Sequence, residues 1–293
     1  MKNTATPFSI QRRRLGVGVA SVLALPLLTQ VATRAAASSH QPAKVLRLAV
    51  VPQLTPVELS KAWSPIVQAL AQIGIACELT VHPSIEEFET EFMQGKADIV
   101  YLNPYHMVMA KRAHRYEPLV RDKRPLQGVL LVKNEGPIKT IEQLKGQRIS
   151  FPAPNAFAAS LYVRAILERQ YRLTYEPHYA FTHRNAVRQV LAGDSAAAGI
   201  VKTTFEGEPP EVRQALRVIY STPEVPPHPI AVHPRISADV RKKISDLLLD
   251  MAKDPVRKPL MQGILMPDPL RARYEQDYEP LEQLKIESFV KKD

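Results

Sequence analysis

The chain has 293 residues, of which 45% are hydrophobic and 23% charged, enough apolar material for a packed core of one or two domains. Its formal net charge of +10 suggests a nucleic-acid partner, but five basic residues and no acidic ones lie within the first 37 residues. Without that segment 34 basic residues face 29 acidic ones, and no zinc finger, basic helix or RNA-binding signature occurs, which argues against nucleic-acid binding.

Residues 1–37 have the pattern of an export signal. A basic head at Arg12–Arg14 precedes an apolar run over 15–28, and the small residues Ala35 and Ala37 are spaced for cleavage. The apolar run is short for a membrane span and contains Pro26. We therefore expect cleavage near Ala37 and a soluble periplasmic protein, exported by the general secretory route or, given the arginines, by the twin-arginine route.

Strand and helix patterns alternate through the first half of the mature chain. The sequence predicts strands at 45–51, 78–81, 97–102, 116–121 and 126–133, and helices at 56–73, 84–93 and 103–114. Ser84, followed three residues later by Glu87, marks the start of the second helix. The single cysteine, Cys77, excludes an internal disulfide, and we expect a small buried residue, with a reactive or metal-binding thiol as the alternative.

The second half repeats the alternation. It predicts strands or extended segments at 148–151, 175–181, 196–201 and 217–220, and helices at 140–144, 154–170, 183–192, 211–216 and 237–252. Such alternation predicts an α/β protein whose sheets are mainly parallel and flanked by helices. We expect two lobes joined by two crossovers, lobe 1 from 38–126 and 222–293 and lobe 2 from 127–221. The tail after the last helix should pack back on lobe 1.

Polar residues that follow strands are the candidate ligand contacts, because ligands of α/β sheets bind beyond the carboxyl ends of the strands. In lobe 1 these are Gln53, Tyr101 and Asn103. Asn103 stands before Pro104 and could instead cap the next helix. Tyr101 alternates out of a buried strand and faces either the cleft or the core.

The segment Asn155, Ala156 and Phe157 opens the first long helix of lobe 2. A helix start offers free backbone N–H groups and the positive end of the helix dipole, which favours an anion. Small alanine side chains would let a ligand approach that backbone. They would equally suit a helix packed tightly on its sheet, and the sequence leaves both interpretations open.

Four further candidates follow later strands. His183 begins a helix beside Thr182, which we expect to be its cap. Lys202 and Thr203 follow the strand at 196–201, and His228 lies in a proline-rich turn. Cationic and neutral donors dominate the whole set, and acids are scarce. This composition suits a small anion better than a sugar or a cation.

Catalytic and metal-binding patterns are missing from the sequence. There is no Gly-x-Ser-x-Gly elbow, His-Glu-x-x-His, phosphate loop or Gly-x-Gly-x-x-Gly. The histidines of the candidate site lie far apart and share no ligand spacing. We therefore expect no enzyme, no bound metal and no cofactor.

Several blocks, taken in order, resemble a known family. LRLAVVPQ, ADIVYLNPY, FPAPNAFAASL, FTHRNAVRQVLAGD and STPEVPPHPIAVHPR are similar to blocks of the phosphate/phosphite/phosphonate-type substrate-binding proteins of ABC importers, over about residues 45–260. The resemblance implies a two-lobed type II periplasmic-binding-protein fold that closes on a ligand. It also implies an ABC permease in the inner membrane as partner.

Two blocks depart from the family pattern. Phosphonate binders typically read Asn-Ser-Thr-Ser-Gly where this chain has 155–159 without hydroxyls, so only backbone N–H groups remain. The family's Thr-His-Asp turn resembles Thr182-His183-Arg184, in which the acid is replaced by a base. The resemblance thus implies a small oxyanion other than an aminoalkylphosphonate.

The sequence prediction is a monomeric periplasmic receptor that captures a small phosphonate-, phosphite- or phosphate-like anion for an ABC importer. The alternative is a periplasmic subunit that presents its solute to a sensor histidine kinase. A third hypothesis is an exported enzyme that reuses the fold. Copurification with a permease or a kinase ectodomain separates the first two, and turnover of the ligand would support the third.

Overall fold

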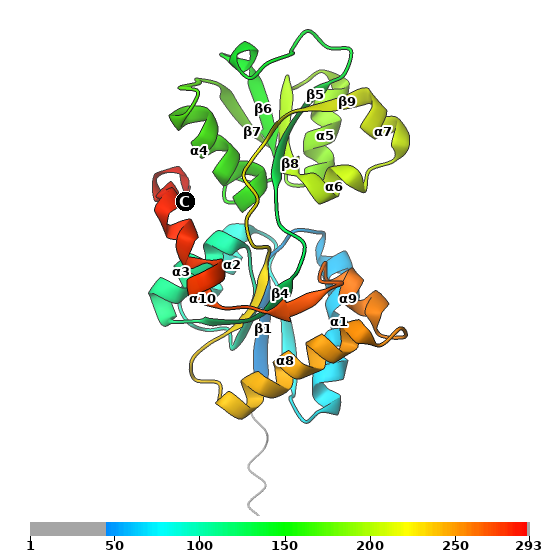
Figure 1. Cartoon of the computed structure of the whole chain (residues 1–293), viewed down its shortest axis with the longest axis vertical. Coiled ribbons are helices and arrows are strands. Elements are labelled where there is room, and N and C mark those ends of the chain that lie inside the picture. The colour runs from blue at the N-terminus through cyan, green and yellow to red at the C-terminus, as the bar shows by residue number, and fades with distance from the viewer. Residues whose placement is uncertain (1–44, 292–293) are drawn as a thin grey trace, which may run out of the picture. The chain divides into compact units, whose positions relative to one another are not determined.

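The computed structural model describes residues 45–291. The predicted export signal at 1–37 lies outside these residues. Within the described part of the chain, no helix combines the length and the apolarity needed to cross a bilayer. The strands form two separate sheets, one in each lobe, with helices packed on both (Figure 1).

Lobe 1 is built on a six-stranded sheet in the order β11-β4-β10-β3-β1-β2. Its strands are β1 (Leu46–Val50), β2 (Cys77–Val81), β3 (Ile99–Tyr101), β4 (Glu117–Asp122), β10 (Pro229–Val232) and β11 (Pro269–Arg271). Its helices are α1 (Pro56–Gln72), α2 (Ile85–Met93), α3 (Pro104–His114), α8 (Ala238–Lys253), α9 (Lys258–Gly263) and α10 (Tyr274–Asp277).

Lobe 2 is built on a five-stranded sheet in the order β7-β6-β8-β5-β9. Its strands are β5 (Gly128–Lys133), β6 (Arg148–Phe151), β7 (Glu176–Tyr179), β8 (Ala197–Val201) and β9 (Leu216–Ser221). Its helical segments are η1 (Glu142–Leu144), η2 (Phe157–Leu161), α4 (Tyr162–Arg169), α5 (His183–Ala192), α6 (Lys202–Glu206) and α7 (Pro210–Ala215).

The sheets are mixed, which corrects the prediction of mainly parallel sheets. The strands joined through helices are parallel: β1 pairs with β2 and β3, and β6 pairs with β7 and β8. The strands that cross between the lobes run against them, β10 with β3 and β5 with β8. This follows from connectivity, because a chain that leaves one lobe and returns from the other enters the sheet from the opposite end.

The two crossovers run side by side between the lobes (Figure 1). One joins β4 to β5 and the other joins β9 to β10. Leu126 and Val225 exchange backbone hydrogen bonds of 2.8 and 3.0 Å between them, which forms an isolated antiparallel bridge. This bridge lies close to the predicted lobe boundaries at 126/127 and 221/222. The exact boundaries remain a prediction.

Several helix starts follow from local sequence. Thr55 and Glu58 form a reciprocal capping box at α1, and the Ser84 hydroxyl accepts from the Glu87 N–H at α2. The predicted helix 183–192 is confirmed as α5, and Gly193 ends it in the left-handed conformation with φ 90°. The expected cap Thr182 is also confirmed, since its hydroxyl accepts from the N–H of Asn185 at 3.0 Å.

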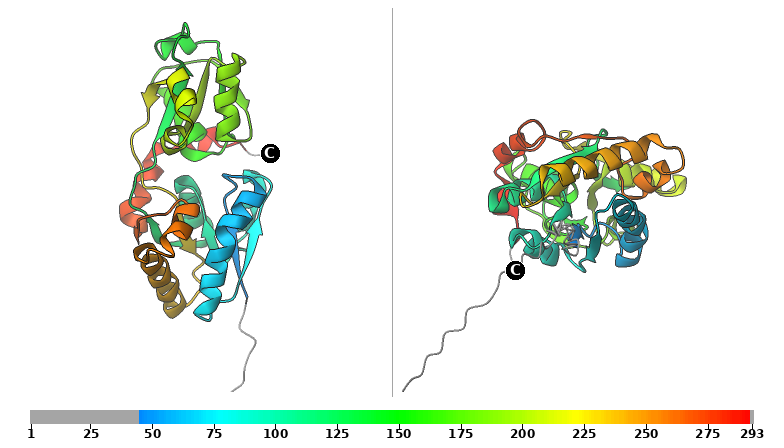
Figure 2. Two further views of the ribbon diagram at one scale, coloured as in Figure 1. Left: turned by 90° about the vertical axis from the view of Figure 1, so that its right-hand side faces the viewer. Right: turned by 90° about the horizontal axis from the view of Figure 1, so that it is seen from below.

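The C-terminal tail corrects a second prediction, because it spans both lobes instead of packing on lobe 1 alone. The tail comprises η3 (Glu279–Leu284), η4 (Ile286–Phe289) and the residues to Lys291. In lobe 1 the guanidinium of Arg112 pairs with Glu282 and Glu287, both at 2.8 Å. In lobe 2, Arg169 and Arg164 on α4 donate to tail carbonyls. The tail lies along both lobes in the turned views of the ribbon (Figure 2).

Candidate ligand-binding cleft

A cleft of about 910 Å³ lies between the lobes, and a small cavity of about 40 Å³ adjoins it. Three predicted site residues line both: Gln53, His183 and His228. Tyr101 and Thr203 line the large cleft only. Asn103, Ala156 and Phe157 line the small cavity only. The structure thus brings eight of the ten predicted residues to these two adjoining cavities. The other two, Asn155 and Lys202, line neither.

A stacked aromatic group holds the lobe 1 wall of this space. His228 and the Tyr101 ring are stacked with centroids 5.5 Å apart, and Tyr101 packs on Trp63 at 5.0 Å. The side-chain nitrogen of Gln53 contacts Nε2 of His228. Burial lowers the pKa of His228 to about 3, helped by the nearby His106 and His183. His228 is therefore a neutral imidazole at neutral pH.

His183 approaches from lobe 2 as the first residue of α5. Its Nδ1 is buried and has no hydrogen-bond partner within the described part of the chain. Burial lowers its pKa to about 4, so this ring is also uncharged at neutral pH. A buried ring nitrogen without a partner is costly unless a ligand supplies one. His183 is thus ready to hydrogen-bond a solute in the cavity.

The helix start at 156–161 has free backbone N–H groups and also packs tightly on the sheet, the two interpretations that its sequence left open. It is a π-helical turn, η2, in which the N–H groups of both Ser160 and Leu161 bond to the carbonyl of Ala156. The first N–H groups of the turn have no partner within the helix. The turn also packs tightly on the sheet, since a Cβ at Gly128 would lie 2.0 Å from the carbonyl oxygen of Ala158.

Phe157 joins the lobes through its ring. It stacks on Tyr105 of lobe 1, with centroids 6.4 Å apart and planes 14° apart, and on Tyr162 of its own lobe at 5.7 Å. The side chain is 2% exposed. The Phe157 ring is therefore packed between the lobes and is not solvated.

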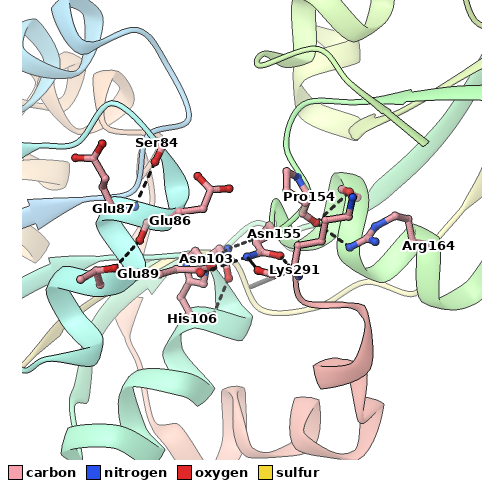
Figure 3. Close-up of polar contacts among 12 residues, drawn as sticks. Ser84, Glu86, Glu87, Glu89, Asn103, His106, Pro154, Asn155, Arg164 and Lys291 are labelled. Carbon is pink, nitrogen blue, oxygen red and sulfur yellow. Dashed lines mark hydrogen bonds and ion pairs between the residues drawn. The ribbon is translucent and has the colours of Figure 1, made fainter. Parts of the chain in front are cut away.

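The two predicted asparagines belong to a network that connects the lobes (Figure 3). Asn103 caps α3 by accepting from the N–H of His106 at 2.8 Å, and its amide donates to the carbonyl of Asn155 at 3.4 Å. Asn155 in turn donates to Glu89 of lobe 1 at 3.2 Å and exchanges two bonds of 3.0 Å with the backbone of Lys291. Both asparagines are fully engaged in holding the lobes together.

Lys202, a predicted ligand contact, lines neither the large cleft nor the small cavity. Its side chain is exposed, and its backbone N–H donates to the carbonyl of Gln127 at 2.9 Å. It is the first residue of α6, a helix that the sequence interpretation missed, and this helix places Thr203 and Thr204 toward the cleft instead.

The large cleft carries charges that the strand-end argument did not select. Arg124 pairs with Asp122 at 2.8 Å, and Arg184 lies 3.9 Å from Glu208. Arg188, one turn after Arg184 on α5, also lines the cleft. By contrast, no lysine, arginine, aspartate or glutamate appears among the described residues that line the small cavity. The small cavity therefore has a lining without these charged residues, and the large cleft has a charged one.

Neither a metal centre nor a reactive thiol is found in the described residues. No group of three or more His, Cys, Asp or Glu side chains is placed there to hold a metal ion. Burial, with the nearby Asp98, raises the pKa of Cys77 to about 11, which keeps the thiol protonated and unreactive.

A model of the periplasmic substrate-binding proteins of phosphonate ABC transporters matches residues 48–281. The chain belongs to this family. It is therefore the periplasmic substrate-binding component of an ABC transporter, as the sequence blocks predicted. Members of the family bind a solute for a membrane permease and are not enzymes.

Solved structures show the same fold at low sequence identity. PhnD1 of Prochlorococcus marinus in complex with methylphosphonate is 15% identical, with a TM-score of 0.72 over 82% of this chain and 97% of that one. A binding component of a Pseudomonas aeruginosa ABC phosphonate transporter is 16% identical, with a TM-score of 0.70 over 82% and 85%. A Xanthomonas citri protein bound to ATP is 17% identical, with a TM-score of 0.69 over 84% and 99%. They confirm the type II periplasmic-binding-protein fold.

Proposed function

We propose that the small cavity is the anion site of this transporter component and that its cargo is a compact oxyanion of the phosphonate, phosphite or phosphate type. The observation that supports the proposal best is the meeting of Gln53 and His228 from lobe 1 with His183 and the η2 start from lobe 2. The phosphonate family and the methylphosphonate complex of PhnD1 point to the same class of cargo.

The binding chemistry relies on neutral donors. At neutral pH both imidazoles are uncharged, so each can donate one hydrogen bond. One N–H of the Gln53 amide faces Nε2 of His228, which leaves the other N–H for the solute. The unpaired N–H groups of the η2 turn and the start of α5 add partial positive charge. Ala156 and the buried Phe157 leave this backbone accessible without any hydroxyl. The site therefore suits a small anion with an apolar substituent.

Delivery and export complete the proposal. The solute-loaded protein acts as a monomer and docks on an inner-membrane ABC permease. The segment 1–37 directs export and is cleaved near Ala37. A permease that copurifies with the loaded protein supports this role, whereas copurification with a sensor-kinase ectodomain would assign the protein to signalling.

A thermal-shift screen of the mature protein tests the cargo. The panel holds methylphosphonate, phosphite, phosphate, methanesulfonate and 2-aminoethylphosphonate, with glucose and arginine as non-anionic controls. A ligand that binds only the folded protein stabilises it, by about 2.7 kcal/mol at a ligand concentration of 100 Kd, and so raises the melting temperature. We expect a shift with one or more of the first three anions and none with the controls.

The outcome that contradicts the proposal is equally clear. A shift with glucose or arginine and with none of the anions would show that the cavity does not hold an oxyanion. His183→Asn keeps a similar volume and polarity but removes the ring nitrogen with no partner, so it should abolish any shift that the cavity produces.

A further inference from the structure

Phe181 has a conformation that is unusual for a large aromatic residue. Its side chain is 89% exposed and its backbone has φ 69°. The N–H of Thr182 donates to the carbonyl of Ala180 at 2.9 Å, which closes a three-residue turn around Phe181. A turn of this kind with positive φ is rare and strained, and for a bulky side chain it is an outlier.

The surrounding contacts impose this strained turn. Before it, the N–H of Ala180 donates to the carbonyl of Phe151 at 2.8 Å. The Asn185 side chain donates to the carbonyl of Ala180 at 3.1 Å, and the Thr182 cap fixes the start of α5. Strain held in place by several independent contacts is typical of functional positions. Here it directs an aromatic ring out of lobe 2 without any packing to compensate.

Apolar residues of lobe 1 lie across the small cavity from this ring. Phe181 lines the cavity together with Pro52 and Ile85. Pro52 directly precedes Gln53 after β1, and Ile85 is the first residue of α2, next to its cap Ser84. Ile85 is already 8% exposed and Pro52 is half-buried, whereas the Phe181 ring is exposed, so the ring is the apolar surface of this cavity that has no packing partner.

We propose that Phe181 is the closing wall of the ligand cavity: when the lobes close, its ring packs against Pro52 and Ile85 and separates the bound solute from solvent. The solute part rests on the function proposed above. The strain of the turn is then offset only in the closed form, where the ring gains buried contact. A solute whose outward-facing group is apolar fits under this wall, whereas a charged outward group would be desolvated against it.

Dissociation kinetics test the wall. Phe181→Asn keeps a residue that tolerates positive φ but removes the ring, and Phe181→Tyr restores the ring. Burial of a Phe side chain corresponds to about a ten- to hundred-fold change in lifetime. We therefore expect methylphosphonate to dissociate about ten- to a hundred-fold faster from the Asn variant and at the wild-type rate from the Tyr variant. Val256→Ala, at an 84% exposed position that lines neither cavity, is the control and should match wild type.

Cross-linking gives a readout that needs no ligand. In a Cys77→Ser background, Phe181→Cys with Pro52→Cys should react with a short bifunctional thiol reagent, since both positions line the small cavity, and closure should make the reaction faster with methylphosphonate than without it. Phe181→Cys with Val256→Cys should not react. Equal cross-linking of the two pairs, or a wild-type dissociation rate in the Asn variant, would overturn the proposal. An Asn variant that binds normally but no longer supports uptake would assign Phe181 to permease docking instead. If no anion binds the wild type, the proposed cargo fails while cross-linking still decides the wall.

Discussion

The amide of Asn155 in lobe 2 donates a hydrogen bond from Nδ2 to Oε2 of Glu89 in lobe 1, at 3.2 Å. The other oxygen of Glu89 lies 2.9 Å from Nε2 of His106, which is 1% exposed. This contact places a charged acceptor of one lobe on a buried amide of the other, directly beside the Asn103 bond to the Asn155 carbonyl. The relative position of the lobes therefore depends on a few specific polar contacts.

Replacement of Asn155 should weaken the association of the lobes. Asn155→Ala removes the bond to Glu89 and both bonds to Lys291, and it leaves the Glu89 carboxylate with one fewer donor. The loss of bonds to buried or charged groups costs about 1–3 kcal/mol. We expect a lower melting temperature and a larger radius of gyration in X-ray scattering of the free protein.

Asn134→Ala is the matched control for this variant. Asn134 makes one side-chain bond, to the carbonyl of Gln214 within lobe 2, and it follows the end of β5 and lines neither cavity. Its replacement should leave the radius of gyration unchanged. Identical scattering from the Asn155 and Asn134 variants would show that the inter-lobe bonds do not set the lobe arrangement.

Substitution of two candidate residues should affect anion affinity differently. His228→Ala removes the ring that contacts Gln53 and stacks on Tyr101, so we expect at least about a ten-fold loss of anion affinity. Lys202→Ala should bind as wild type, because the Lys202 side chain lines neither cavity. Isothermal titration of both variants with the anion found in the screen gives the comparison. A strong loss in the Lys202 variant would place that side chain in the closed site.

The two neutral histidines should make the free protein sensitive to acid. Burial lowers the pKa of His183 to about 4 and of His228 to about 3, whereas an unfolded histidine titrates near about 6.5. Between these values the unfolded chain binds protons that the folded chain does not. Stability is therefore complete above about pH 6.5 and falls as the pH drops toward 4.

Urea unfolding at a series of pH values between 4 and 7.5 measures this effect. The double variant His183→Asn/His228→Gln should show a shallower decline than wild type across this window, because the carboxylates that also titrate there are common to both proteins. Parallel curves would mean that these two rings are not held neutral in the folded protein.

Glycine at position 199 is required by the close approach of the η2 turn. A Cβ there would lie 2.3 Å from the carbonyl oxygen of Ala159 and 2.6 Å from the Phe151 ring. Overpacking of this kind costs about 1–3 kcal/mol or more. Gly199→Ala should therefore lower the melting temperature and displace the cavity wall, which anion titration would detect. Gly207→Ala, where the nearest atom lies at 3.4 Å, should be tolerated.

Local sequence was sufficient to predict the features of the fold that depend on neighbouring residues. The helix at 183–192, its Thr182 cap and its Gly193 end are each determined within a few residues, and the prediction was correct. The Asn103 cap was foreseen as one of two alternatives for the same reason. The cavity-lining positions of Gln53, His183 and His228 followed from a general rule about strand ends.

Two of the missed features depend on distant parts of the chain, and a third depends on a helix too short to leave a sequence pattern. Asn155 bonds to Lys291, 136 residues away, so no local pattern could show that it connects the lobes. The antiparallel pairing of β10 with β3 depends on where the returning crossover enters the sheet. The helix α6 is only five residues long and has no side-chain cap, and so the orientation of Lys202 could not be predicted.

The C-terminal tail adds a third attachment between the lobes, beside the two crossover strands. Two adjacent strands act as a hinge that permits both bending and torsion of one lobe against the other. The tail joins α3 to α4 at a distance from those strands, through Arg112 on one side and Arg169 on the other (Figure 1). An attachment away from the hinge opposes torsion more than bending. We therefore expect the motion between the lobes to be mainly a bending about the crossovers, which would bring the same two surfaces together at each closure.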